Sequence, residues 1–202
     1  MNNIFTNTRK GFLMVTLFAT MLSFANENDF YNINVEASKT TLTLNYAKEG
    51  SALSIKDLNG SVLYSETIKA TGRYKREFDL SFLPNGDYKF EVDKDLQIKE
   101  IPFTLNSGVV TFNKNEEKLI YKPFIRVSGD LVYISKLALD GEDLKVDIYF
   151  TKNNNRSHSE LVISENIKGD ATIEKVYRLE DLNQGKYQVI LHAADRRFEK
   201  NI

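Results

Sequence analysis

Two histidines are the first residues of this sequence whose chemistry could serve a reaction. His158 lies in the polar run 153–159, and His192 ends an apolar run at 187–192. A catalytic or metal site needs several convergent groups, and neither histidine has a second histidine or a suitably spaced carboxylate beside it in the sequence. We therefore expect both to be solvated, and we assign no catalytic, cofactor-binding or metal-binding residue.

An acidic cluster and an aromatic segment are the remaining candidate sites. Asp140, Glu142 and Asp143 surround a glycine, and oxygen ligands from one loop are what calcium takes. The EF-hand spacing is absent, so we favour a β-turn, in which Asp and Gly are preferred for backbone reasons, over a calcium site. Tyr121 and Phe124 could contribute to a glycan platform, since tyrosine is enriched at interfaces. The chain has no tryptophan, and we favour a core role for its tyrosines.

The composition excludes several classes of function. The 202 residues include 27 basic and 28 acidic residues, for a net charge of −1, and no cysteine. Without cysteine there are no disulfides, thiolate metal sites, thiol nucleophiles or lipid-modified cysteine anchors. Scattered charges of both signs argue against nucleic-acid binding, which requires a dense cluster of cations. No cofactor is expected.

The first 25 residues have the pattern of a secretory signal peptide. Arg9 and Lys10 precede an uncharged, mainly apolar stretch at 11–25 that ends in Ser23, Phe24 and Ala25. Small residues at both ends of this tripeptide indicate cleavage after Ala25. We expect the mature protein in the periplasm, at the cell surface or outside the cell, and not spanning a membrane.

An internal repeat predicts two domains in the mature chain. Residues 78–92 align without a gap on 177–191, at an offset of 99, and the segments 65–69 and 164–168 match at the same offset. Further upstream the offset falls to 93 and then to 90, as expected for length changes in loops. We therefore predict domains at 26–115 and 116–202, with the polar run 113–118 as the linker.

Short segments with alternating apolar residues predict an all-β fold. Period-two alternation is typical of half-buried strands, and Asn59 with Gly60 indicates a tight hairpin. Pro102 predicts an edge strand or a strand end. Seven strands per copy indicate two tandem immunoglobulin-like β-sandwiches, and no segment has a helical period. The expected strands are 40–46, 52–56, 61–65, 75–80, 87–92, 96–101 and 109–112, then 121–127, 130–136, 144–150, 161–164, 173–179, 187–192 and 197–200.

Two motifs of the first copy resemble a known family. Asp57-x-x-Gly60, and then Leu83-x-x-Gly86-x-Tyr88 before a further strand, resemble the C-terminal sorting domain of the Por, or type IX, secretion system of Gram-negative bacteria. The resemblance implies an immunoglobulin-like sandwich and an export address.

The second copy keeps only part of this pattern. It retains Leu182-x-x-Gly185-x-Tyr187 and a closing strand, but it lacks the Asp-x-x-Gly turn. We expect both glycines to occupy turns with positive φ, and both tyrosines to be core or corner aromatics whose hydroxyl reaches the backbone.

These observations favour an exported, non-enzymatic binding or structural protein. Its expected partner is a protein or glycan of the cell envelope. The alternative is a secretion-targeting module whose partner is the secretion machinery. A hydrolase is the least favoured class, because its carboxylates would have to come from scattered loops.

Overall fold

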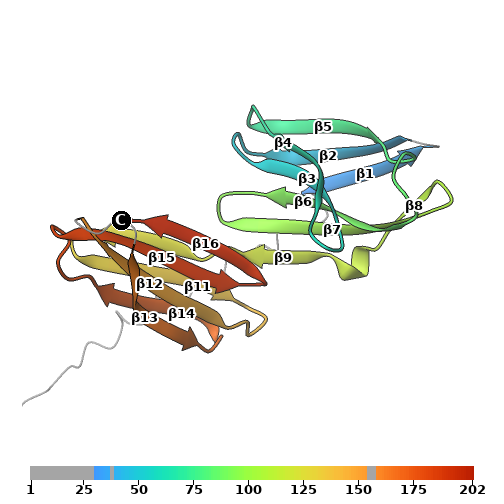
Figure 1. Cartoon of the computed structure of the whole chain (residues 1–202). Coiled ribbons are helices and arrows are strands. Elements are labelled where there is room, and N and C mark those ends of the chain that lie inside the picture. Colours follow the sequence, from blue (N-terminus) through green and yellow to red (C-terminus); the bar gives the residue numbers. More distant parts are fainter. Residues whose placement is uncertain (1–29, 37–38, 154–157) are drawn as a thin grey trace, which may run out of the picture.

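The computed structural model describes residues 30–36, 39–153 and 158–202, which form sixteen strands and one 3₁₀ turn (Figure 1). The predicted signal peptide lies outside the described residues. Within them, no helix is long and apolar enough to span a membrane. The elements are β1 (Tyr31–Glu36), β2 (Lys39–Ala47), β3 (Ala52–Asp57), β4 (Val62–Thr67), β5 (Gly72–Asp79), β6 (Gly86–Asp93), β7 (Gln97–Asn106), β8 (Val109–Phe112), η2 (Lys114–Glu116), β9 (Lys118–Tyr121), β10 (Phe124–Ser128), β11 (Leu131–Ala138), β12 (Leu144–Lys152), β13 (Ser159–Ile167), β14 (Ala171–Arg178), β15 (Gly185–Ala193) and β16 (Arg196–Asn201).

The two halves share a sheet topology, to which the first half adds β8 and β9. In the first half, one sheet has the order β1-β2-β5, and the other has the order β4-β3-β6-β7-β8, with β9 also paired to β7. In the second half the sheets are β10-β11-β14 and β13-β12-β15-β16. Leu53 pairs with Val92 in the first half, and Val146 pairs with Leu191 in the second. These pairs correspond through the offsets of 93 and 99, so the sequence repeat is also a repeat of strand register.

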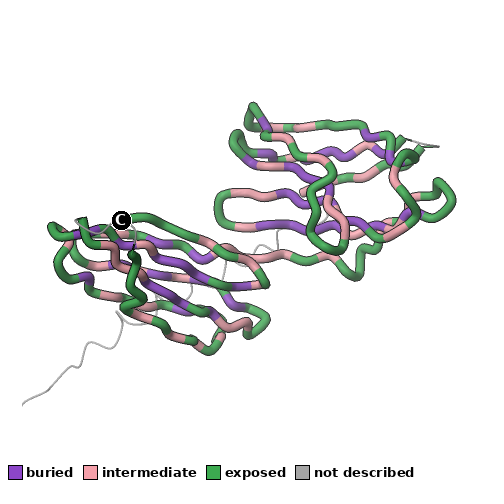
Figure 2. The backbone as a smooth tube through the Cα atoms, viewed as in Figure 1, coloured by how far each residue is buried: buried purple, intermediate pink, exposed green. Residues whose placement is uncertain are grey.

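Each half has its own hydrophobic core between its two sheets (Figure 2). Leu42 and Phe90 are fully buried in the first core, and Val132 and Val189 in the second. Along β6 and β15 every second side chain enters the core, which is the alternation that the sequence shows. The predicted all-β sandwich architecture is confirmed.

The two repeated tyrosines are corner residues, as predicted. The Tyr88 hydroxyl donates to the Pro84 carbonyl oxygen at 2.8 Å, and the Tyr187 hydroxyl donates to that of Glu180 at 2.7 Å. Each side chain is 7% exposed. Each hydrogen bond satisfies a buried phenol while fixing the chain just before β6 or β15.

The prediction that Gly86 and Gly185 occupy positive-φ turns is wrong. Neither has a positive φ, and each is the first residue of a strand. A Cβ on Gly185 would lie 2.4 Å from the Phe150 ring, so glycine here permits close packing. Gly60, in the predicted hairpin between β3 and β4, does have a positive φ, of +82°.

The prediction that Pro102 lies at an edge or ends its strand is also wrong. β7 continues through Pro102 to Asn106, and Pro102 pairs with Lys89 of β6. On the other side of β7, β9 pairs with residues 97–100 and β8 with residues 103–106. The Pro102 carbonyl accepts from Asn113 at 3.0 Å on this side, so the missing N–H falls at the junction between two partner strands.

The first half extends further along the chain than the predicted boundary at 115/116. Strand β9, at 118–121, pairs with β7 of the first half, and β10 begins only at Phe124. Within the predicted linker, Glu117 forms an ion pair with Lys99 at 2.9 Å and accepts the Tyr31 hydroxyl. Strand β1, which contains Tyr31, has no counterpart among the expected strands. The polarity of residues 113–118 predicts a linker, but the carboxylate of Glu117 in this run is bound by the first sandwich.

Candidate functional site

A pair of acids lies on the outer face of the first half. Glu91 of β6 and Glu100 of β7 are direct cross-strand partners, and like charges in that position repel. Their side chains are only 4% and 11% exposed. The neighbours of Glu91 along β6, Phe90 and Val92, enter the core, so Glu91 points to the opposite, outer face of the sheet. A buried acid on an outer face requires compensating cations and a covering element.

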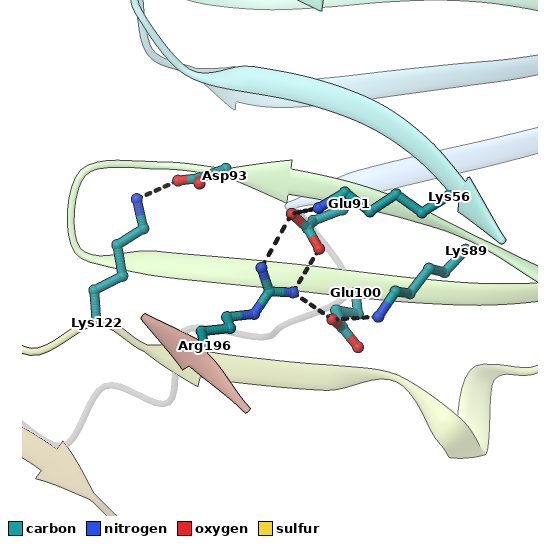
Figure 3. Close-up of polar contacts among 7 residues, drawn as sticks. All are labelled: Lys56, Lys89, Glu91, Asp93, Glu100, Lys122 and Arg196. Atoms are coloured by element: carbon teal, nitrogen blue, oxygen red, sulfur yellow. Dashed lines mark hydrogen bonds and ion pairs between the residues drawn. The ribbon is translucent and has the colours of Figure 1, made fainter. Parts of the chain in front are cut away.

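Arg196 of the second half supplies a compensating cation and covers the two acids (Figure 3). It is the first residue of β16, immediately after the turn from β15. Its guanidinium donates to Glu91 through Nη1 at 3.3 Å and Nη2 at 2.5 Å, and to Glu100 through Nη2 at 2.6 Å. One planar donor fork therefore bridges two acids of the other half.

Two lysines of the first half complete this network. Lys56 of β3 donates to Glu91 at 2.7 Å, and Lys89 donates to Glu100 at 2.7 Å. Burial works to raise the pKa of Glu91, but hydrogen bonds from Arg196 and Lys56 outweigh it and hold that pKa below its ordinary value. Both acids are therefore compensated, and we name this five-residue network (Lys56, Lys89, Glu91, Glu100, Arg196) the joint.

A separate ion pair lies beside the joint. Lys122, just after β9, contacts Asp93 at the end of β6, and its backbone N–H donates to the Leu96 carbonyl at 2.9 Å. The chain is therefore held on the first sandwich at Lys122 before it enters β10.

The joint forms one wall of a cleft between the halves. The cleft has a volume of about 720 Å³, within the range of small-molecule sites. Its lining combines five cations, five acids and an apolar wall, so its formal charge is balanced. The lining residues are Lys56, Gly60, Lys89, Glu91, Glu100, Lys118, Leu119, Ile120, Tyr121, Lys136, Leu137, Leu139, Asp140, Glu142, Ala194, Asp195 and Arg196.

His192 has a carboxylate neighbour that the sequence did not indicate. Its Nε2 lies 3.5 Å from Asp147 Oδ2, and the Ser164 hydroxyl donates to Asp147 Oδ1 at 2.7 Å. A serine nucleophile must contact the histidine, but here the aspartate lies between the two. Asp147 also pairs with Lys145 at 3.2 Å. Asp147 is therefore held between several polar partners, and it is only 5% exposed. His158 is exposed.

The acidic cluster at 140–143 forms a turn whose side chains diverge. Glu142 contacts Lys136, whose side chain is 1% exposed, at 2.8 Å. Asp143 accepts from Lys168 at 2.7 Å and from the Gly169 N–H at 3.0 Å. Asp140 accepts the N–H of Glu142 at 3.3 Å. Within the described residues no group of three potential ligands converges on one point.

The two residues of the predicted aromatic platform, Tyr121 and Phe124, do not lie in one site. Tyr121, in β9, lines the cleft, whereas Phe124, the first residue of β10, is half exposed and does not line it. Sequence reasoning missed the joint altogether. The one available signal was that Lys89 and Glu91 alternate with core residues and must face outward, but nothing local identifies the element that covers them.

No protein-family model and no curated protein matches the chain. The solved structures that match it include a biofilm associated protein BSP domain at 12% identity, covering 85% of this chain and 29% of that chain, with a TM-score of 0.24. The human OSCAR ligand-binding domain matches at 8% identity over 86% and 97%, with a TM-score of 0.25. A glycosyl hydrolase family 2 member from Bacteroides cellulosilyticus matches at 17% identity over 86% and 25%, with a TM-score of 0.24. The chain spans less than a third of the first structure, and similarities this remote assign no function.

Proposed function

We propose that this protein is an exported, non-enzymatic structural or binding module that holds two β-sandwiches in one orientation. The joint is the observation that carries the proposal. Arg196 of one half is held by two nearly buried acids of the other half. Contacts with this geometry fix relative orientation because the guanidinium fork and the carboxylates are directional partners.

The described carboxyl groups with a shifted pKa are all shifted in the same direction. Nine carboxyl groups have a shifted pKa, and in each the pKa is lowered, because hydrogen bonds and nearby cations outweigh the effect of burial. A general acid at neutral pH would need a raised pKa. These groups are Asp57, Glu66, Glu77, Asp79, Glu91, Asp95, Asp143, Asp147 and Glu165.

Export is tested by expressing the full chain in a Gram-negative host. The intact mass of the protein recovered from the periplasm and medium is then measured by mass spectrometry. The expected intact mass is that of a chain beginning at Asn26, because cleavage is predicted after Ala25. A matched variant with Arg9 and Lys10 changed to Glu reverses the n-region charge and should reduce export. Recovery of the uncleaved chain in the cytoplasm alone would refute this part of the proposal.

The non-enzymatic part is tested with a panel of glycosidase, esterase and peptidase substrates. The purified mature chain should show no turnover above a buffer control. Ser164→Ala and His192→Ala address the arrangement that most resembles catalytic machinery. Turnover that either substitution abolishes would show that the protein is an enzyme.

A further inference from the structure

A second hollow lies at the open edge of the first sandwich, where β4 of one sheet passes to β5 of the other. It has a volume of about 550 Å³ and lies away from the joint, with which it shares no residue. We name it the β4–β5 hollow. Its lining residues are Glu66, Thr67, Lys69, Ala70, Thr71, Arg73, Tyr74 and Arg76.

The lining of this hollow has an excess of positive charge. Three of its residues are cationic and only Glu66 is acidic. The two carboxylate oxygens of Glu66 accept the hydroxyls of Tyr64 and Tyr74, and Arg76 lies 3.5 Å from one of them. Among the described residues, Lys69 and Arg73 form no ion pair. Hydrogen bonds from these two hydroxyls lower the pKa of Glu66, and the charge of Lys69 helps to lower it, but neither Lys69 nor Arg73 has a described acid in direct contact.

The second half provides an internal comparison, because the same strands recur there at the offset of 99. The counterpart of Lys69 is Lys168, which is neutralised by Asp143 at 2.7 Å. The counterpart of Arg76 is Lys175, which pairs with Glu165 at 2.6 Å. Arg73 is replaced by Thr172. The scaffold is thus shared, and the excess of cations belongs to the first half alone.

We propose that the β4–β5 hollow binds the carboxylate or sulfate groups of an acidic polysaccharide. Arg73 presents a guanidinium, which matches a planar carboxylate or a sulfate with two parallel hydrogen bonds. Thr67 and Thr71 place hydroxyls in the same lining. The Thr71 Oγ1 accepts the Glu49 N–H at 3.1 Å, so its own proton is available to a sugar hydroxyl.

Size and charge favour a glycan over a nucleic acid. A hollow of about 550 Å³ falls within the range for small ligands and matches a short stretch of sugar units. Nucleic acids require many phosphate contacts along a basic track, and the whole chain has a net charge of −1. The two cations without an ion pair among the described residues, Lys69 and Arg73, suit a ligand with one or two anionic groups at the site.

The proposal is tested by calorimetry on the mature chain at low ionic strength, about 50 mM, where exposed charges are weakly screened. The probes are a galacturonate hexasaccharide and a heparin-derived hexasaccharide, with maltohexaose as the neutral counterpart. Both acidic probes should bind with one site per chain, and the neutral one should not. Arg73→Ala should weaken binding about tenfold, the value of one charge-assisted contact, and Arg73→Lys should weaken it less.

Lys168→Ala is the matched control, because it removes the same type of charge from the equivalent position of the second half. It should leave binding unchanged, whereas Lys69→Ala should weaken it. Both lysines and Arg73 are exposed, so thermal melting should be unchanged in all variants. Absence of binding to both acidic probes would overturn the proposal, as would binding that Arg73→Ala leaves intact. Binding confined to single-stranded DNA or to phosphatidylglycerol vesicles would also overturn it. Arg196 variants should bind the acidic probes normally, which separates this proposal from the one based on the joint.

Discussion

Removal of the Arg196 guanidinium should release the two halves from their fixed orientation. Arg196→Ala deletes three hydrogen bonds to Glu91 and Glu100 and leaves those acids facing each other across β6 and β7. Lys56 and Lys89 remain in place and continue to neutralise them. The sandwiches should therefore stay folded while the contact between them weakens.

The size of the effect follows from the charge and burial of the joint. Hydrogen bonds to charged groups contribute about 1.5–3 kcal/mol each, but desolvation of a buried pair offsets much of that gain. We take about 2 kcal/mol for the whole contact, which corresponds to roughly a 30-fold preference for the docked orientation. Without Arg196, docked and undocked orientations should be populated within about one order of magnitude of each other.

Double electron–electron resonance between two spin labels measures the distribution of distances between the halves directly. The chain has no cysteine, so Lys75→Cys and Lys186→Cys introduce the only thiols, one on an exposed strand of each half. The parent should give one narrow distance distribution, and Arg196→Ala a broad one. Arg197→Ala is the control, because Arg197 pairs with Glu199 of its own strand at 2.8 Å. A narrow distribution in Arg196→Ala, or equal broadening in Arg197→Ala, would refute the reasoning.

Three further predictions address acid sensitivity and the two repeated motifs. The lowered pKa of Glu91 means that its contribution is complete above the unfolded value of about 4.3 and is lost as the pH falls through the folded value; the label distances should therefore broaden in acid, and Glu91→Gln should broaden them already at pH 7. Gly185→Ala should cost about 1–3 kcal/mol in urea unfolding through overpacking, since its Cβ would lie 2.4 Å from a ring atom, whereas Gly86→Ala, with 3.7 Å available, should cost under about 1 kcal/mol; equal costs would contradict this assignment. Tyr88→Phe and Tyr187→Phe should each cost about 1 kcal/mol in the same assay, the usual value of one hydrogen bond, and stability unchanged in both would show that the corner bonds contribute nothing.

The fold could be predicted because its determinants are local. Alternation along β6 gives the strand and its buried face, and Asn59 with Gly60 indicates the hairpin between β3 and β4. Along β2 the alternation holds for Leu42 and Leu44 but fails at Tyr46, which is 69% exposed and lies in a register shift. The errors arose where a neighbouring element changed what a residue type means. Pro102 sits within a strand because the two partners on its open side leave a gap, and Gly185 is required by the Phe150 ring rather than by its own φ.

The joint could not be predicted because it depends on how two sandwiches meet. Glu91 and Arg196 are 105 residues apart, and nothing in the period-two pattern of either segment distinguishes a covered outer face from a solvated one. The pairing of His192 with Asp147 is hidden in the same way, since it requires the register between β12 and β15. The resemblance to a sorting domain rests on turn and corner residues, whose roles in the structure are conformational, so a role in export stays a prediction.

The sequence repeat does not extend to most residues of the joint. Arg196 contacts Glu91 and Glu100 head to tail, an arrangement that could in principle add further copies. The position of the second half that corresponds to Glu91 at the offset of 99 is Ile190, and the one corresponding to Lys89 is Gln188. Glu100 corresponds to Glu199, which pairs with Arg197 of its own strand at 2.8 Å, so the second half has one of the two acids. In the first half, Gln97 stands where the second half has Arg196, so that end lacks the donor. Apart from Glu100, the residues of the joint are therefore not repeated at the offset of 99, so the contact depends on residues in which the two halves differ.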